Sequence, residues 1–271
     1  MARQAIATLL TDFGTTDPYV AAMKGALLNV CPRAQIIDIC HDIPAHDILS
    51  GSFVLAEAAP YFPPETVHIA VVDPGVGTER RVLVGRFADQ IFLFPDNGII
   101  SFVAEAFPLQ ALVAVRNANF APMEAISMTF HGRDVFAPLA GQILNGLDIR
   151  KLGPQPDTFK TLDLPVPVEQ DDKIVGQVIY VDRFGNCISN ITRQSVQKHW
   201  SINAPLEVRC GGREIGPLVG TYEFAPQGEK LALFNSMGLL EVAVNRGRAC
   251  DILGASIGSA VEVVETSAAG K

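Results

Sequence analysis

The sequence of 271 residues has few charged side chains, an excess of acidic over basic ones, and no long apolar run. A net charge of −8 argues against nucleic-acid binding, because phosphate binding requires a basic surface. No apolar run reaches the roughly 18 residues needed to cross a bilayer. The segment MARQAIATLLTDFG lacks the apolar core and cleavage site of a signal peptide. We therefore expect a cytoplasmic protein that binds neither nucleic acid nor membranes.

Patterns for a metal, a disulfide framework or a dinucleotide are also missing. The five cysteines are scattered, and none forms a C-x-x-C pair or stands at metal-ligand spacing from a histidine. His41 and His46, with Asp42 and Asp47, match no helix-face metal pattern. The fingerprint G-x-G-x-x-G is absent after the first expected strand, which argues against NAD. We expect reduced thiols, no metal site and no cofactor.

Hydrophobic residues, by contrast, make up 48% of the chain, enough for a large core. Apolar runs alternate with helical patterns up to about residue 150, which favours a Rossmann-like α/β domain with a mostly parallel sheet and helices on both faces. The expected strands cover 6–14, 34–40, 66–75, 81–87 and 90–98. The expected helices cover 18–30, 47–62, 98–107 and 132–146.

The pattern changes after a Pro-rich stretch at 153–172. Beyond it come short runs separated by turn residues, which is typical of a small barrel or sandwich. Only 195–200 has a helical pattern, and the run at 249–254 is counted with the strands. We place an N-terminal domain at 1–162, a linker at 163–172 and an all-β barrel domain at 173–271.

Three segments, 11–20, 71–81 and 130–138, place ionisable residues at the expected ends of strands, where an open α/β sheet forms its ligand crevice. Asp12 either accepts hydrogen bonds from a ribose diol or caps the next turn. Asp73 lies in a Pro–Gly turn, and an arginine of the Arg80–Arg81 pair can fold back onto it as a bidentate partner. His131 begins a helix, and a structural and a catalytic role are equally open for it.

Two polar turns stand out in the C-terminal part. Asp182 and Asn186 lie in VDRFGN, and Ser236 lies in NSMG. Each turn alone is typical of an ordinary hairpin. Tyr222 and Phe224 either fill a barrel or provide an aromatic face on which a base stacks.

Seven segments in order, TDFG, HDIP, VVDPGVGTERR, PDNG, FHGRDVFAP, DRFGN and NSMGLLEVAVN, resemble the S-adenosyl-L-methionine hydroxide adenosyltransferases over nearly the whole chain. The resemblance implies a Rossmann-like domain followed by a β-barrel, and a homotrimer with active sites between neighbouring subunits. It implies the reaction of S-adenosyl-L-methionine with water to give adenosine and L-methionine. S-adenosyl-L-methionine is then the substrate and not a cofactor.

The resemblance also implies roles for individual residues. The family's water-handling triad maps onto Asp73, Arg80 and His131, and its ribose-diol aspartate onto Asp12. The remaining substrate-binding positions are Asp182 for the methionine amine, Asn186 for adenine, Ser236 for the methionine carboxylate, and Phe130, Gly132 and Tyr222 in the walls of the site. Met237 stands where the related halogenases have arginine.

Three other functions remain open at this point. A halide-dependent adenosyl transferase shares the resemblance, but such enzymes carry tyrosine at the position of Asp73 and lack the arginine–histidine arrangement. A non-catalytic module that binds S-adenosyl-L-methionine or adenosine needs only the binding residues. Aspartates at strand ends also suggest a metal-dependent phosphoesterase, which EDTA would inhibit.

Overall fold

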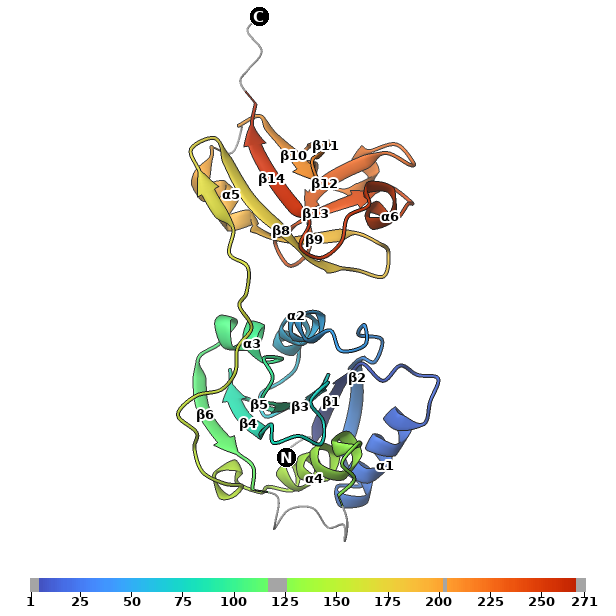
Figure 1. The fold of residues 1–271 in the computed structure, drawn as a ribbon, viewed down its shortest axis with the longest axis vertical. Helices are drawn as coiled ribbons and strands as arrows, with labels where there is room; N and C mark the ends of the chain where they lie inside the picture. Colours follow the sequence, from blue (N-terminus) through green and yellow to red (C-terminus); the bar gives the residue numbers. More distant parts are fainter. Residues whose placement is uncertain (1–4, 117–125, 202–203, 267–271) are drawn as a thin grey trace, which may run out of the picture. The chain divides into compact units, whose positions relative to one another are not determined.

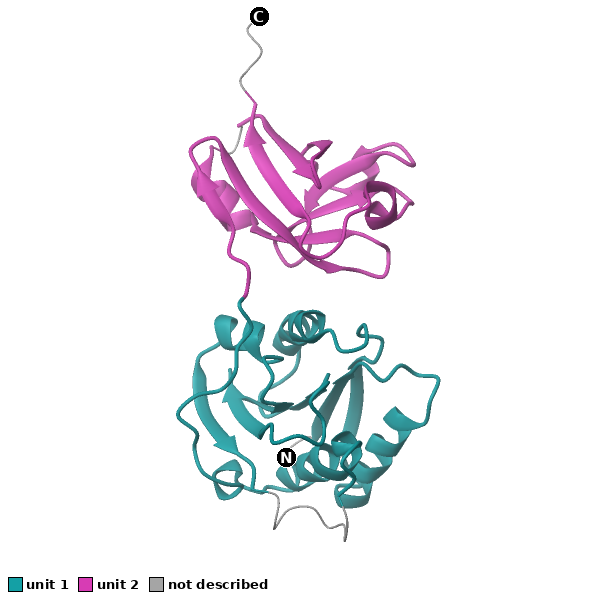
Figure 2. Cartoon of the chain, viewed as in Figure 1, with its two compact units in different colours: residues 1–163 teal, residues 164–271 magenta. Residues whose placement is uncertain are grey.

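The computed structural model describes residues 5–116, 126–201 and 204–266. The chain divides into two compact units, Met1–Asp163 and Leu164–Lys271 (Figure 2). No helix in the described ranges is both long enough and apolar enough to cross a membrane.

Unit 1 is built on a six-stranded sheet with the order β2-β1-β3-β5-β4-β6. Its strands are β1 (Ile6–Thr11), β2 (Gln35–Cys40), β3 (Val67–Val71), β4 (Val82–Phe87), β5 (Gln90–Pro95) and β6 (Leu109–Ala114). The neighbours from β2 to β5 run parallel, whereas β4 is antiparallel to both β5 and β6. Since β4 is reversed, the loop that leaves β3 re-enters the sheet at the same edge. The sheet is therefore mixed, with a parallel half like that of a Rossmann fold.

Helices cover both faces of this sheet (Figure 1). The helical elements are α1 (Tyr19–Val30), α2 (Ile48–Ala58), η1 (Ala59–Tyr61), α3 (Ser101–Ala106), η3 (Gly132–Phe136), α4 (Ala137–Leu144) and η4 (Ile149–Lys151). The first helix begins at Tyr19 directly after Pro18, which is favourable at a helix start. Asp47 caps α2 by accepting the Ser50 N–H at 3.0 Å, as serine, threonine and aspartate do at helix N-termini.

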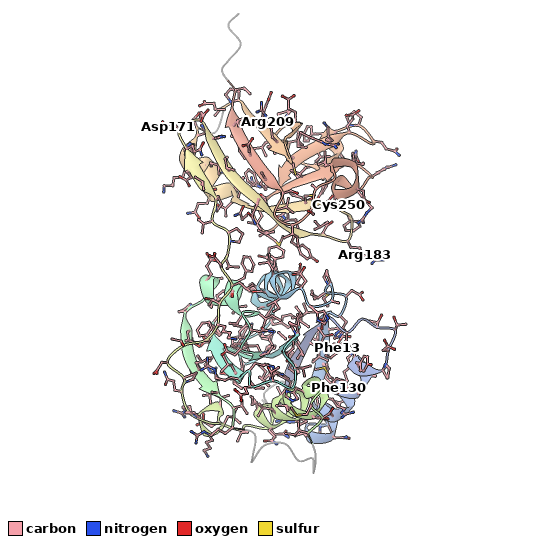
Figure 3. All side chains as sticks on the ribbon, in the orientation of Figure 1. Phe13, Phe130, Asp171, Arg183, Arg209 and Cys250 are labelled. Carbon is pink, nitrogen blue, oxygen red and sulfur yellow. The ribbon has the colours of Figure 1, made fainter. Side chains whose placement is uncertain are left out.

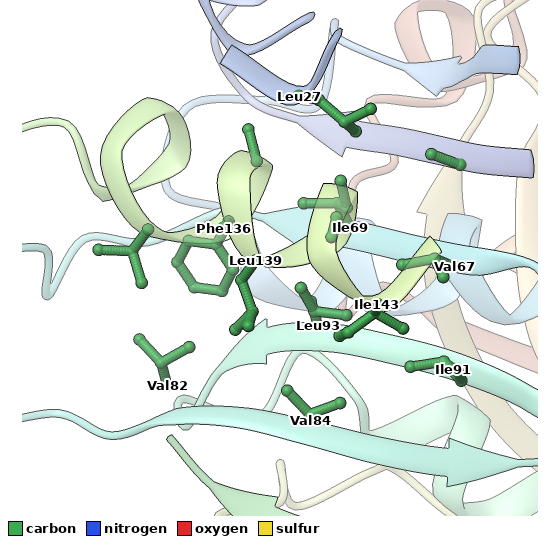
Figure 4. Packing of buried hydrophobic residues seen from close by; sticks show 14 of the residues in the cluster. Leu27, Val67, Ile69, Val82, Val84, Ile91, Leu93, Phe136, Leu139 and Ile143 are labelled. Carbon is green, nitrogen blue, oxygen red and sulfur yellow. The ribbon is translucent and has the colours of Figure 1, made fainter. Parts of the chain in front are cut away.

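Two hydrophobic cores lie on the two sides of the sheet. One packs α1 and α4 against the strands, and Figure 4 shows Phe136, Leu139 and Ile143 over the residues of β3, β4 and β5. The other packs α2 and α3 through Leu55 and Val103. The predicted α/β domain with helices on both faces is confirmed. The strand β6 was not predicted, although residues 111–115 form an apolar run; its first two residues are exposed.

Unit 2 is an antiparallel sheet with the order β11-β10-β14-β8-β9-β13-β12, to which β7 adds beside β8. Its strands are β7 (Val168–Gln170), β8 (Lys173–Val181), β9 (Cys187–Thr192), β10 (Leu206–Cys210), β11 (Arg213–Pro217), β12 (Lys230–Phe234), β13 (Leu239–Val244) and β14 (Ala260–Glu265). After β11 the Val219 N–H donates to the Ala232 carbonyl at 2.8 Å. This bond joins the two ends of the sheet, which is therefore barrel-like, as predicted.

Three short helical elements complete unit 2, namely α5 (Arg193–His199), η5 (Tyr222–Phe224) and α6 (Ala249–Leu253). The strand expected at 249–254 is wrong, because this segment forms α6. It ends at Gly254 with a φ of +63°, a left-handed helix cap that glycine adopts without strain. The stretch expected as a linker contains β7, an exposed strand of three residues that pairs with β8.

Candidate active site

A cavity of about 310 Å³ opens at the edge of unit 1 where β1 and β3 end. It collects the three segments that the sequence singled out, because the carboxyl ends of parallel strands meet at one edge of a sheet. Its lining consists of Asp12, Phe13, Tyr19, Ala45, His46, Val71, Asp73, Val76, Thr129, Phe130, His131 and Gly132.

Asp73, Arg80 and His131 form one hydrogen-bonded group at this cavity. Arg80 Nε donates to Asp73 Oδ1 at 3.0 Å and to Oδ2 at 2.8 Å, and Arg80 Nη2 donates to Asp73 Oδ2 as well. Arg80 Nη2 also lies 2.9 Å from His131 Nδ1. The Asp73 and Arg80 side chains are only 3% and 6% exposed. The structure thus brings the three predicted catalytic residues together.

The arginine fixes the tautomer of His131. A guanidinium can only donate hydrogen bonds, so Nδ1 must accept, and the ring proton of the neutral form sits on Nε2. Burial lowers the pKa of His131, and the Arg80 charge lowers it further against smaller opposing effects of Asp73 and Asp134. A neutral histidine with a free Nε2–H is the form that this arrangement favours at pH 7.

Close contact between two loops places these residues. Gly77, in the loop between β3 and β4, has a φ of +78°, and a Cβ there would lie 2.2 Å from the Met128 carbonyl oxygen. The loop can therefore approach the segment before His131 only because position 77 is glycine. On the other side, the Asp134 carboxylate accepts the Ser127 N–H at 2.9 Å. The first contact joins the Asp73 loop to the His131 segment, and the second fixes the conformation of the His131 segment itself.

Asp12 lies at the end of β1 and reaches the same cavity. Its Oδ2 accepts the His46 N–H at 2.9 Å, and its side chain is 9% exposed. Gly14, with a φ of +67°, turns the chain after Asp12. The carboxylate is thus oriented from one side, while its position in the lining makes it accessible to a ligand hydroxyl.

Phe130 and Gly132 flank His131 in the wall of the cavity. A Cβ on Gly132 would lie 3.0 Å from Met23 Sδ and 3.4 Å from the Phe13 ring, so glycine permits this close packing. Phe130 contacts Phe13 and Tyr19 edge to face. Sequence reasoning missed Phe13 and Tyr19, since an aromatic residue in a turn carries no motif of its own.

Three further charged residues of these segments, Arg81, Arg133 and Asp134, form ion pairs in the framework. Arg81 binds Asp96 through Nε at 2.8 Å and also donates to the Thr158 carbonyl at 2.9 Å. Arg133 binds Asp134 through Nε at 2.6 Å. Burial opposes ionisation of Asp134, but hydrogen bonds from Arg133 and the Ser127 N–H outweigh it and lower the pKa of Asp134.

A second pocket, of about 630 Å³, lies in unit 2 beside the turn between β8 and β9. It is lined by Arg183, Phe184, Asn186, Tyr222, Val244, Asn245, Arg246, Gly247 and Arg248. Asn186 is held by Asp182, whose Oδ1 accepts the Asn186 N–H at 2.8 Å and whose Oδ2 accepts Asn186 Nδ2 at 3.1 Å. Two predicted substrate residues, Asn186 and Tyr222, therefore share this pocket, with Asp182 behind them.

Glu241 was missed by sequence reasoning. It is 3% exposed on β13, and the Tyr222 hydroxyl donates to its Oε1 at 2.6 Å. Burial and the nearby Asp182 charge raise the pKa of Glu241, and burial together with Glu241 raises the pKa of Tyr222. In the sequence LLEVAV, Glu241 is indistinguishable from an exposed strand position.

Ser236 and Met237 lie in the turn between β12 and β13. The Met237 N–H donates to Asn235 Oδ1 at 3.0 Å, so this backbone donor is already engaged. Neither residue belongs to the described lining of the two cavities. The structure thus places both in one turn without bringing them to the other predicted site residues.

Within the described ranges, no group of three or more His, Cys, Asp or Glu residues is arranged to hold a metal. His41, considered as a ligand from sequence, is buried and bonded through Nδ1 to Thr11 Oγ1 at 2.8 Å. Asp47 acts as the cap of α2.

Family models match both units. The model of the SAM hydroxide adenosyltransferase N-terminal domain matches residues 7–153, and that of the C-terminal domain matches residues 176–262. The chain belongs to the SAM hydroxide adenosyltransferase family. The family predicted from the sequence is confirmed, and the cavity of unit 1 and the pocket of unit 2 fall within the two matched domains.

Relatives in this SAM hydroxide adenosyltransferase family extend over nearly the full chain. An (R)-S-adenosyl-L-methionine hydrolase of Thermus thermophilus is 36% identical, over 94% of this chain and 98% of its own length. One of Salinispora tropica is 38% identical, over 93% and 95%. A crystal structure of an uncharacterised conserved protein from Thermotoga maritima superimposes with a TM-score of 0.89 at 35% identity, covering 96% of this chain and all of that one. A fluorinase of Nocardia brasiliensis is more distant, at 27% identity over 90% and 91%.

Proposed function

We propose that the chain hydrolyses S-adenosyl-L-methionine to adenosine and L-methionine, with Asp73, Arg80 and His131 handling the attacking water. The observation that carries this proposal is the bonded group of these three side chains at the edge of a cavity that also contains Asp12. The hydrolase names of relatives at 36% and 38% identity support it.

The chemistry is a displacement at the ribose C5′ carbon. The water oxygen forms a bond to C5′ while the C5′–S bond breaks, and the bonding electron pair stays on sulfur. The positively charged sulfonium thereby becomes the neutral thioether of methionine, and the water releases one proton. Charge is dispersed in the transition state, and a cavity that excludes bulk water favours this dispersal.

Each member of the group has a separate task in this displacement. Asp73 accepts the proton of the water or directs its hydrogen bond, as a general base does. Arg80 holds both carboxylate oxygens of Asp73 and keeps them in one orientation. His131, neutral and protonated on Nε2, donates to the water oxygen and directs its lone pair toward C5′.

Substrate binding is divided between the two units in this proposal. Asp12 accepts the ribose hydroxyls beside Phe130 and Gly132. Asn186 and Tyr222 contact the adenine, Asp182 the methionine amine, and Ser236 with Met237 the methionine carboxylate. We propose a homotrimer with active sites at subunit interfaces. Light scattering tests the trimer by measuring the molar mass of the purified protein.

Isotopic water tests the reaction directly. In H₂¹⁸O, the purified protein should release adenosine with one ¹⁸O atom at its 5′ oxygen, together with unlabelled methionine, by mass spectrometry. Adenosine without the label would show that water does not attack C5′. If no adenosine is released over time, the chain would be a non-catalytic binding module.

A halide reaction is the alternative with the same substrate. Incubation with S-adenosyl-L-methionine and excess chloride or fluoride should yield only adenosine. A 5′-halo-5′-deoxyadenosine peak would reassign the chain to the halide-dependent branch. Full activity after EDTA treatment is expected, since the proposal includes no metal or cofactor.

The names of the hydrolase relatives specify the R configuration at sulfur. We propose that this chain also prefers the R epimer of S-adenosyl-L-methionine. Measuring kcat/KM separately for the two sulfonium epimers tests this preference. A cytoplasmic location belongs to the same proposal, and cell fractionation tests it.

A further inference from the structure

Three aromatic side chains stand together in the wall of the unit 1 cavity. The centroid of Phe13 lies 6.0 Å from that of Tyr19 and 5.9 Å from that of Phe130, and those of Tyr19 and Phe130 are 5.4 Å apart. Their ring planes cross at 65°, 75° and 89°. Figure 3 shows Phe13 and Phe130 as neighbours in unit 1. The rings come from the turn after β1, the first residue of α1 and the residue before His131.

These rings are not closed into a core. Tyr19 is 48% exposed, Phe13 and Phe130 are half-buried, and all three line the cavity. Their positions are nevertheless fixed from behind. The Arg133 guanidinium lies over the Phe130 ring, 5.0 Å from its centroid, and Asp134 neutralises the charge of that guanidinium. An exposed cluster held in this way is suited to receive a ligand group.

The charge around the rings favours a cation. The described lining includes the carboxylates of Asp12 and Asp73 but no lysine or arginine. Arg80 lies beside the cavity, where Asp73 binds its guanidinium. Aromatic faces attract cations whose charge lies within about 6 Å of the ring centroid. The cavity thus combines the Asp12 carboxylate, whose nearest charged partner is the exposed His46 ring at 3.8 Å, with an aromatic wall.

We propose that Phe13, Tyr19 and Phe130 form an aromatic cage for the sulfonium group of the substrate. This inference rests on the proposed function, since it assigns a place to one part of the same substrate. A sulfonium has no N–H to donate, so carboxylates attract it only by charge, whereas aromatic faces also contact its alkyl groups. The sulfur is bonded to C5′. Because Phe130 adjoins His131, a sulfur held at the rings places C5′ near the proposed water site.

The cage also distinguishes the substrate from its product. When the C5′–S bond breaks, the sulfur becomes a neutral thioether, and the attraction between cation and rings disappears. The same difference separates S-adenosyl-L-methionine from S-adenosyl-L-homocysteine, which lacks the methyl group and the charge. The ratio of the two affinities therefore measures the cage.

Calorimetric titration of both ligands tests the proposal, in an Asp73→Asn background that slows turnover. Tyr19→Leu and Phe130→Leu should each weaken binding of S-adenosyl-L-methionine about five- to tenfold, within the range of a partly desolvated cation–π contact. Binding of S-adenosyl-L-homocysteine should change less than about twofold. Tyr61→Leu, which removes a ring that is 82% exposed outside the cavity, should alter neither affinity.

An equal loss for both ligands would overturn the cage and leave the rings as an apolar wall. If Phe130→Leu fails to fold, Tyr19→Leu decides the question, because this exposed ring contributes least to packing. Failure of the proposed hydrolysis can be distinguished from failure of the aromatic cage. If the unmodified chain releases no adenosine, the proposed function fails, whereas release with an unchanged affinity ratio in the variants removes only the cage.

Discussion

The cavity of unit 1 and the pocket of unit 2 differ in how their side chains are held before any ligand arrives. In unit 1, Asp73, Arg80 and His131 are almost fully buried and bonded to one another. In unit 2, Phe184 is 75% exposed, and Arg183 extends from the turn between β8 and β9 (Figure 3). The first region is organised in advance, whereas the rim of the second is exposed around a held Asn186.

This difference matches the work proposed for each region. Dipoles and donors that act on a transition state must be oriented before the reaction, since their reorganisation would add to the barrier. A binding surface for a flat base needs only an apolar face and a few polar contacts. Changes in unit 1 should therefore lower kcat, and changes in unit 2 should raise KM.

The largest expected effect comes from Asp73→Asn, which should lower kcat about 10²- to 10⁴-fold, the usual contribution of a general base. The chain offers a matched control in Asp96→Asn. Asp73 and Asp96 are 3% and 4% exposed, and each binds one of the adjacent arginines Arg80 and Arg81. Adenosine release measured by chromatography should be retained at saturating substrate in the folded Asp96→Asn protein. Equal losses in both variants would assign Asp73 a structural role.

The next effect concerns His131. His131→Gln should lower kcat about 10²-fold, while His199→Gln in unit 2 should leave it unchanged. Burial and Arg80 lower the pKa of His131 from 6.5, so the neutral form persists below that pH. The acid limb of kcat/KM in the unmodified chain should therefore lie below pH 6.5. A limb centred above pH 7 would contradict a neutral His131.

Acid should separate the stabilities of the two units. His68 in β3 is fully buried against Thr8, and burial lowers its pKa to about 4, against a smaller opposing effect of Gln90. The unfolded chain binds a proton at this histidine below pH 6.5 and the folded chain does not, so stability falls as the pH drops from about 6.5 toward 4. Between pH 7.5 and 5 the free energy of unfolding of unit 1 should fall by about 2 kcal/mol from this group.

Urea unfolding can follow each unit by its own signal. Trp200, the single tryptophan, is buried in the core of unit 2, so its emission maximum reports that unit. Far-UV circular dichroism is dominated by the helices of unit 1. Lowering the pH should shift the second curve more than the first, and His68→Gln should reduce this difference. An equal shift of both curves would contradict the assignment to His68.

The smallest effect is expected at the rim of the unit 2 pocket. Phe184→Ala should raise KM about tenfold with kcat nearly unchanged, since stacking of a base on an aromatic ring contributes about 1–3 kcal/mol. Phe224→Ala is the matched control, because Phe224 is 72% exposed but is not part of the described pocket lining. Steady-state kinetics measures both. If Phe184→Ala lowered kcat without changing KM, the assignment of catalysis to unit 1 and binding to unit 2 would be contradicted.

The sequence predicted contacts between residues close in the chain better than contacts between residues far apart in it. The pairing of Asp73 with an arginine of the Arg80–Arg81 pair was foreseen, since a glycine-rich loop of a few residues allows only a few closures. The strands and helices of unit 1 followed from their apolar periods. The strand β6 was missed although residues 111–115 are apolar, and α6 was predicted as a strand because five residues are too few to show a helical period.

Distant relations came from the family resemblance instead. Nothing local in the sequence joins His131 to Arg80, since the bond between them depends on how two loops meet through Gly77. Glu241 shows the same limit. Its hydrogen-bond donor, the Tyr222 hydroxyl, comes from another element. The aromatic contacts of Phe13 and Tyr19 likewise appear only when the chain is folded.

The reversed direction of β4 has a consequence for the order in which the site assembles. Asp73 and Arg80 are separated by seven residues, whereas Arg80 and His131 are separated by 51. Closing the short loop costs less chain entropy than closing the long one. The ion pair can therefore form and persist without the histidine, so a local opening of η3 would stop the reaction while both charges stay neutralised. Amide hydrogen exchange should accordingly be faster at Gly132 than in the strands β3 and β4.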